Sequence, residues 1–206
     1  SVIPKEELGE ISDIIKNSNA IVLTDEVYKN FYFEGEHSSI SEFEGMKDRT
    51  IILDGFSKSF AMTGWRLGYG VFPEKLVEPI SRLITNSVSC TSSFSQIAAI
   101  EAIDGPQDSV FKMMDEFKAR REIIVEGLNS INGITCRNPK GAFYTFPNVT
   151  KSGFSGNEFT KKALEDCGVA LVPGKSFGES GKNFVRISYA NSIENIENAI
   201  NRLSFF

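Results

Sequence analysis

The sequence predicts an α/β protein, because short apolar runs alternate along it with stretches of helical periodicity. Gly-Pro and Pro-Gly pairs separate some of these segments, as expected for turns between secondary-structure elements. Hydrophobic residues make up 41% of the 206 residues, which is enough to form a core. Together these observations favour strand–helix units over an all-helical or an all-strand chain.

The first half of the chain begins with a predicted helix. Pro4 suits the start of a helix, and Leu8, Ile11 and Ile15 recur on one helical face. Further along, apolar runs predict strands, and two stretches of helical period follow them. In chain order these are the strands 20–23, 50–53 and 67–71, and the helical stretches 76–84 and 94–98.

Gly105-Pro106 interrupts the helical periodicity, so we predict two domains, residues 1–106 and residues 107–206. The second begins with a long helix over residues 110–128. Ser155 and Glu158 form a capping box that opens another helix, and Ser192 is suited to cap the last one. Strands are predicted between these helices, over residues 143–146, 169–172 and 184–189. This order of elements is typical of a small α+β domain.

The composition argues against several classes of function. A net charge of −5 does not favour nucleic-acid binding, and no apolar stretch approaches the length needed to cross a membrane. Cys90, Cys136 and Cys167 are odd in number and lack paired metal-ligand spacing, and His37 is the only histidine. We therefore expect no metal site, no nucleic-acid or membrane partner, and a reducing, cytoplasmic location.

Two charged residues come just after predicted strands. Asp25 follows the strand over residues 20–23, and Lys58 follows the strand over residues 50–53. In open α/β sheets ligands bind beyond the carboxyl ends of the strands. Asp25 and Lys58 are therefore candidate site residues by position alone.

Lys58 and Arg66 share a loop rich in small and hydroxyl residues, S-K-S-F-A-M-T-G-W-R-L-G-Y over residues 57–69. A partly desolvated lysine can lose its proton and attack an aldehyde, and the arginine fork suits a phosphate. An aldehyde that bears a phosphate would engage both. On composition alone, however, ordinary solvated loop charges are the favoured interpretation of these two residues.

This string resembles the cofactor-lysine signature of the class I and II aminotransferases, the fold-type I pyridoxal-phosphate (PLP) enzymes. Other segments stand in the family's order: D-E-V-Y at 25–28, R-R at 120–121, G-A-F-Y at 141–144, V-P-G at 172–174, and F-V-R-I-S at 184–188. The resemblance implies the carboxyl-terminal portion of such an enzyme. It comprises part of the large PLP-binding domain, with a mostly parallel sheet, and the small α+β domain after a linking helix.

The resemblance also implies roles for the candidate residues. Lys58 would hold PLP as a Schiff base and later carry a proton between substrate and cofactor. Asp25 would face the pyridine nitrogen, and Tyr28 would donate to the phenolate oxygen. Ser57 and Arg66 would bind the phosphate. Each could instead be a turn, packing or loop residue.

Arg186 lies on a strand with Val185 and Ile187, so it could be an edge-strand charge. In the family, the arginine at this place grips the substrate α-carboxylate. The implied reaction is amino-group transfer between an amino acid and a 2-oxo acid, by a homodimer. The alternatives are a PLP-dependent lyase on the same scaffold and an inactive fragment, since much of the family's pocket lies outside these residues.

Overall fold

The computed structural model describes residues 2–204. The chain divides into two compact units, Ser1–Phe111 and Lys112–Phe206, and each is described by itself. The division falls inside a helix, α4, which spans Asp108–Ser130. The domain boundary placed after residue 106 stays a prediction.

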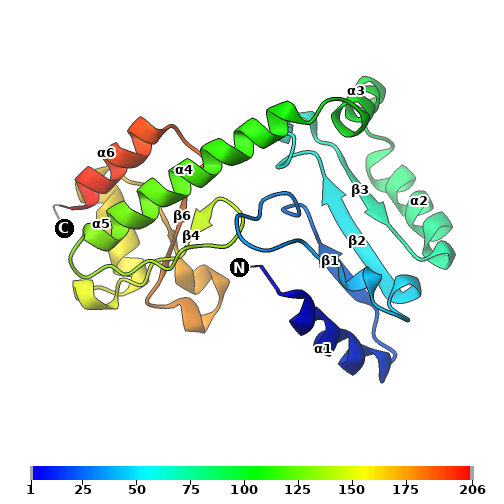
Figure 1. The fold of residues 1–206 in the computed structure, drawn as a ribbon, viewed down its shortest axis with the longest axis horizontal. Helices are drawn as coiled ribbons and strands as arrows, with labels where there is room; N and C mark the ends of the chain where they lie inside the picture. The colour runs from blue at the N-terminus through cyan, green and yellow to red at the C-terminus, as the bar shows by residue number, and fades with distance from the viewer. Residues whose placement is uncertain (1, 205–206) are drawn as a thin grey trace. The chain divides into compact units, whose positions relative to one another are not determined.

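The first unit contains a three-stranded sheet in the order β1-β2-β3 (Figure 1). Its strands are β1 (Val22–Asp25), β2 (Thr50–Gly55) and β3 (Gly68–Val71). β1 and β2 are parallel, as the expectation of a mostly parallel sheet requires. β3 runs antiparallel to β2, so the described sheet is mixed.

The strand boundaries change the position of both candidate residues. β1 begins two residues later than predicted, so Asp25 is its last residue rather than the residue beyond it. β2 extends to Gly55, because Asp54 and Gly55 pair with Tyr69 and Gly68 of β3. The two glycine backbones lie so close that a Cβ on Gly68 would be 3.1 Å from the Asp54 carbonyl oxygen. Lys58 consequently lies in the turn that follows this pairing.

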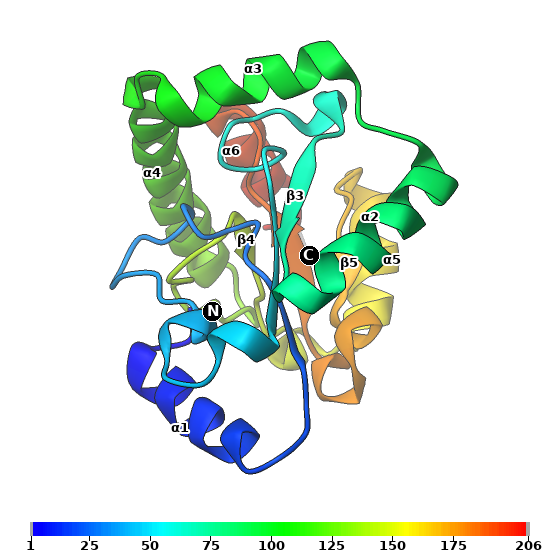
Figure 2. The same ribbon diagram turned by 90° about the vertical axis from the view of Figure 1, so that its right-hand side faces the viewer.

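Three helices complete the first unit: α1 (Lys5–Lys16), α2 (Glu74–Val88) and α3 (Ser93–Asp104). All three agree with the predicted helical segments. Leu8 of α1 packs in a buried cluster with Ile40 and Met46. In Figures 1 and 2, α1 and α2 lie on opposite sides of the sheet.

The second unit contains short antiparallel strands in the order β4-β6-β5. These are β4 (Tyr144–Thr145), β5 (Val172–Pro173) and β6 (Val185–Ser188). The helices are α4, α5 (Gly156–Cys167) and α6 (Ile193–Leu203). The predicted capping box is confirmed, with Ser155 and Glu158 each bonded to the other's backbone, and the Ser192 side chain caps α6.

The strand predicted over residues 169–172 is wrong for most of its length. α5 ends at Cys167 and is capped by Gly168, whose backbone is left-handed with φ +66°. The Val169 N–H then donates to the Ala163 carbonyl at 2.8 Å, which keeps Val169 in the helix terminus. Pairing with β6 therefore begins only at Val172.

Short 3₁₀ helices occupy the connections. They span Ile40–Glu42, Lys47–Arg49, Thr63–Trp65, Thr150–Ser152, Gly174–Phe177 and Glu179–Gly181. Within residues 2–204, no helix combines the length and the apolar character needed to cross a membrane.

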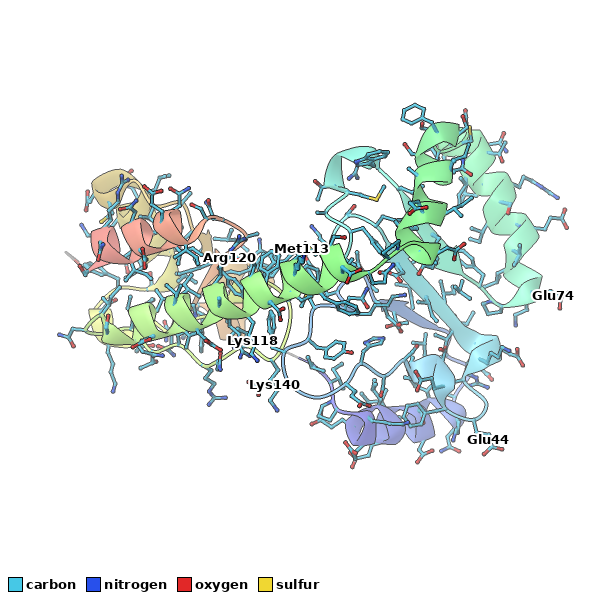
Figure 3. The ribbon with its side chains drawn as sticks, turned by 45° about the horizontal axis from the view of Figure 1, so that its top comes forward. Glu44, Glu74, Met113, Lys118, Arg120 and Lys140 are labelled. Atoms are coloured by element: carbon cyan, nitrogen blue, oxygen red, sulfur yellow. The ribbon has the colours of Figure 1, made fainter. Side chains whose placement is uncertain are left out.

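The α4 helix carries the Arg120-Arg121 pair, which the sequence alone could place on a solvated helix face. Figure 3 shows Lys118 and Arg120 on this helix. Arg120 follows the solvated pattern in part, with an i,i+4 ion pair to Glu116 at 3.5 Å. Arg121 does not, because it is buried and donates to the Pro139 carbonyl at 3.1 Å. The two arginines therefore have different environments.

We expect Cys136 to resist alkylation at pH 8 while the exposed Cys90 reacts. Burial raises the pKa of the Cys136 thiol to about 11, and the thiolate is the reactive form. At pH 8 this leaves about a hundredth of the thiolate that an ordinary cysteine would have. A short iodoacetamide pulse followed by peptide mass spectrometry measures both sites. Equal labelling of the two residues would contradict the described burial.

Candidate active site

Lys58 lies in a turn that is held in place by apolar packing. Phe56 and Met62, on either side of it, are buried in one cluster with Leu67 and Ala99. The Ala61 N–H donates to the Lys58 carbonyl at 3.1 Å, which closes the turn. Lys58 itself is half-buried. The turn therefore fixes the backbone of Lys58 and leaves its side chain partly accessible.

Tyr28 is the candidate residue that the structure brings to Lys58. The Lys58 Nζ lies 5.8 Å from the centroid of the Tyr28 ring. Tyr28 belongs to the turn after β1, and its ring also makes an edge contact with Phe31 at 6.1 Å. The parallel pairing of β1 with β2 puts the two turns side by side, because Asp25 is in register with Leu53.

Asp25 and Glu26 are adjacent acids with different environments. The Glu26 carboxylate has partners within the first unit. It accepts from the Ser39 hydroxyl at 2.7 Å and lies 3.0 Å from the His37 ring nitrogen. Asp25 is exposed and accepts the Val27 N–H at 3.2 Å. Asp25 is therefore the acid of this pair that is accessible to a ligand. His37 is half-buried beside the Glu26 carboxylate.

Arg66 and Ser57 lie on either side of Lys58 in the sequence. Arg66 is exposed, and its backbone is in the left-handed region, with φ +53°. Its guanidinium donates to the Thr63 carbonyl at 2.8 Å. It lines an open hollow of about 800 Å³, formed by residues of the segments 61–66 and 88–95. Lys58, Asp25 and Tyr28 are not among the residues that line it. Ser57 is half-buried beside Lys58.

Arg186 belongs to the second unit and is placed only within it. Its guanidinium carbon lies 4.6 Å from the centroid of the Tyr144 ring and 4.7 Å from that of Phe177. Two aromatic rings therefore orient the guanidinium plane, which is a favourable cation–π arrangement. This packing limits the directions in which the N–H groups of the Arg186 guanidinium can donate hydrogen bonds.

Sequence reasoning missed a buried charge beside the candidate site. The Asp54 side chain is 4% exposed and forms an ion pair with Lys29 at 2.5 Å. It also accepts from the Tyr69 hydroxyl at 2.6 Å and from the Gly55 N–H at 2.7 Å. We call Lys29, Asp54 and Tyr69 the Asp54 cluster.

The pKa values of Lys29 and Tyr69 are both raised in the Asp54 cluster. Partial burial lowers the pKa of Lys29, but hydrogen bonds and charge attraction to Asp54 and Tyr69 outweigh it, so the pKa is raised. The pKa of Tyr69 is also raised, first by burial and then by Asp54. Both residues thus keep their protons at neutral pH, and both hydrogen bonds to Asp54 persist there.

Comparison with known proteins identifies the family. The family model described as Aminotransferase class I and II matches residues 1–203. The chain belongs to this family. Its members use PLP. The expected family is therefore confirmed.

Relatives and solved structures give the extent of the likeness. The chain is 39% identical to "Aromatic-amino-acid aminotransferase 2" of Thermococcus litoralis, over 98% of this chain and 53% of that protein. It is also 39% identical to "Aspartate aminotransferase" of Pyrococcus abyssi, with the same coverage. The crystal structure of the aromatic aminotransferase from Pyrococcus horikoshii OT3 superposes with a TM-score of 0.96 at 38% identity, over 100% of this chain and 55% of that one.

These matches confirm the predicted α/β aminotransferase fold. They also show that the chain spans about half the length of the relatives it matches. The expectation that the shared part is the carboxyl-terminal one is not confirmed by these coverages.

Proposed function

We propose that the protein containing this chain is a PLP-dependent aminotransferase that moves an amino group between an amino acid and a 2-oxo acid, with Lys58 as the lysine that holds PLP. The observation that supports this most is the contact of Lys58 Nζ with the Tyr28 ring, 5.8 Å from its centroid. It joins the turns that follow two parallel strands, where open α/β sheets bind ligands.

The residues of this edge fit the chemistry of PLP. An amine, a phenol and an exposed carboxylate come from Lys58, Tyr28 and Asp25, which lie at or just past the ends of β1 and β2. PLP offers an aldehyde, a phenolate oxygen and a pyridine nitrogen, which are matching partners. Arg66 is exposed, and its guanidinium suits the phosphate.

The proposed roles follow from these groups. When bound, PLP supplies an electron sink for the pair left on the substrate α-carbon. The Asp25 carboxylate holds a proton on the pyridine nitrogen, and the Tyr28 hydroxyl donates to the phenolate oxygen. Lys58 would hold the cofactor and would move the substrate α-proton as a general base. Ser57 and Arg66 bind the phosphate.

Product analysis tests this function in the protein that contains the chain. Aspartate and aromatic amino acids are suitable first substrates, since relatives carry these names. With an amino acid and no added 2-oxo acid, we expect the PLP-loaded protein to complete one half-reaction, which gives a 2-oxo acid and an equal amount of pyridoxamine phosphate. Release of another fragment without pyridoxamine phosphate would show a lyase instead, and no product from a panel of amino acids would indicate an inactive protein.

Replacing Arg186 with lysine is expected to raise KM for the amino acid about 30- to 100-fold and to change kcat much less. Lysine keeps the charge but loses the two-pronged donor set that we propose for the α-carboxylate, which corresponds to about 2–3 kcal/mol. Steady-state kinetics with Lys182→Arg as a control checks this. A fall in kcat with unchanged KM would contradict the role in substrate binding.

We further propose that the protein is a cytoplasmic homodimer. Large apolar side chains on one helix of the first unit support a covering partner: Phe94, Ile97, Ile100 and Ile103 of α3 are each more than half exposed. Sedimentation analysis of the whole protein checks whether it is a dimer. A monomer at micromolar concentration would contradict it.

A further inference from the structure

The Asp54 cluster joins the three segments that carry the proposed PLP residues. Lys29 directly follows Tyr28, Asp54 precedes Lys58 by four residues, and Tyr69 follows Arg66 by three. The contacts inside the cluster are short, and Lys29 also donates to the Tyr69 hydroxyl at 3.1 Å. One buried carboxylate thereby connects the turn after β1, the end of β2 and the beginning of β3.

We propose that Asp54 is a positioning residue for PLP, and that with Lys29 and Tyr69 it holds the segments of Tyr28, Lys58 and Arg66 in their working arrangement. This inference rests on the proposed function. Asp54 is not proposed to touch the cofactor, and it acts through the backbone of the three segments.

The energetics of burial favour such a role. A carboxylate with a 4% exposed side chain is costly unless it is paired and hydrogen-bonded, and removal of one partner leaves an uncompensated charge. The Tyr69 ring also packs against Phe56 at 5.9 Å, and Phe56 belongs to the buried cluster under the Lys58 turn. A change in the Asp54 cluster is therefore transmitted to that turn.

The same geometry links the cluster to the Tyr28–Lys58 contact. Both interactions join the segment after β1 to the segment at the end of β2. If the Asp54–Lys29 pair is lost, the segment after β1 is held there less firmly, and Tyr28 moves more freely relative to Lys58. The effect should then resemble the loss of the Tyr28 hydroxyl.

The test uses the whole protein with Asp54→Asn, Tyr69→Phe and Tyr28→Phe. Asp13→Asn is the control, because Asp13 forms an exposed ion pair with Lys16 on α1. Two quantities are measured: the Kd of PLP, and the pH midpoint of the absorbance of the borohydride-reducible PLP adduct. We expect Asp54→Asn to raise the Kd about tenfold and to move the midpoint in the same direction as Tyr28→Phe. Asp13→Asn should change neither.

A lower melting temperature for Asp54→Asn with unchanged Kd and midpoint would overturn the inference, because the cluster would then only stabilise the fold. If Asp54→Asn does not fold, Tyr69→Phe takes its place in the test. It keeps the ring packing and removes the hydrogen bonds of the Tyr69 hydroxyl with Asp54 and Lys29, so we expect the same changes with smaller size. If the unsubstituted protein forms no reducible adduct, the proposed function is wrong, and so is the inference that rests on it. An adduct that forms normally while Asp54→Asn leaves both quantities unchanged overturns the inference alone.

Discussion

Replacing Lys58 with alanine is expected to lower the transamination rate by at least about 10⁴-fold, because it removes the amine that we propose attaches the cofactor and transfers the α-proton. Lys58 is half-buried in a closed turn, and its Nζ lies 5.8 Å from the centroid of the Tyr28 ring. Single-turnover kinetics with PLP and an amino acid measures the effect.

Two further substitutions make the Lys58 result specific. Lys58→Arg keeps the positive charge but not a nucleophilic amine, and it should be as impaired as Lys58→Ala. Lys47→Ala changes an exposed lysine in the same unit and should leave the rate unchanged. Substantial activity in Lys58→Ala would contradict the role of this residue.

Replacing Asp25 with alanine is expected to reduce kcat about 10²- to 10³-fold without abolishing the borohydride-reducible PLP adduct. A carboxylate beside the pyridine nitrogen keeps that nitrogen protonated, and a preorganised charge of this kind is typically worth this much. The exposed position of Asp25 at the end of β1, next to the internally bonded Glu26, is the structural reason.

The measurement for Asp25 combines kcat with the amount of reducible adduct. Asp48→Asn is a matched control, since Asp48 is also exposed in the first unit but lies before β2 rather than after β1. A normal kcat in Asp25→Ala would assign Asp25 to the turn alone, where it accepts the Val27 N–H.

The sequence was sufficient to predict the helices and the order of the elements, because periodicity and caps are local. Ser155 and Ser192 begin their helices as predicted, since each cap depends on residues three positions away. Strand ends were less predictable, because they depend on pairing with a distant partner. β2 reaches Gly55 through β3, and β5 is short because Gly168 and Val169 complete the end of α5.

Only those residues of the candidate site that belong to short sequence motifs could be predicted. The D-E-V-Y and lysine segments could be recognised, and the parallel pairing of β1 with β2 explains why Tyr28 meets Lys58. The Asp54 cluster could not be found this way. Lys29, Asp54 and Tyr69 are separated by 15 to 40 residues, and only the register of β2 with β3 brings the last two together.

The location of the covalent cofactor tests the central proposal most directly. The whole protein is incubated with PLP, reduced with borohydride, digested and mapped by mass spectrometry for phosphopyridoxyl-lysine. We expect one modified peptide, containing Lys58, at close to one label per chain. A label at exposed lysines such as Lys47 with Lys58 unmodified, or no label at all, would contradict the proposal that Lys58 holds the cofactor.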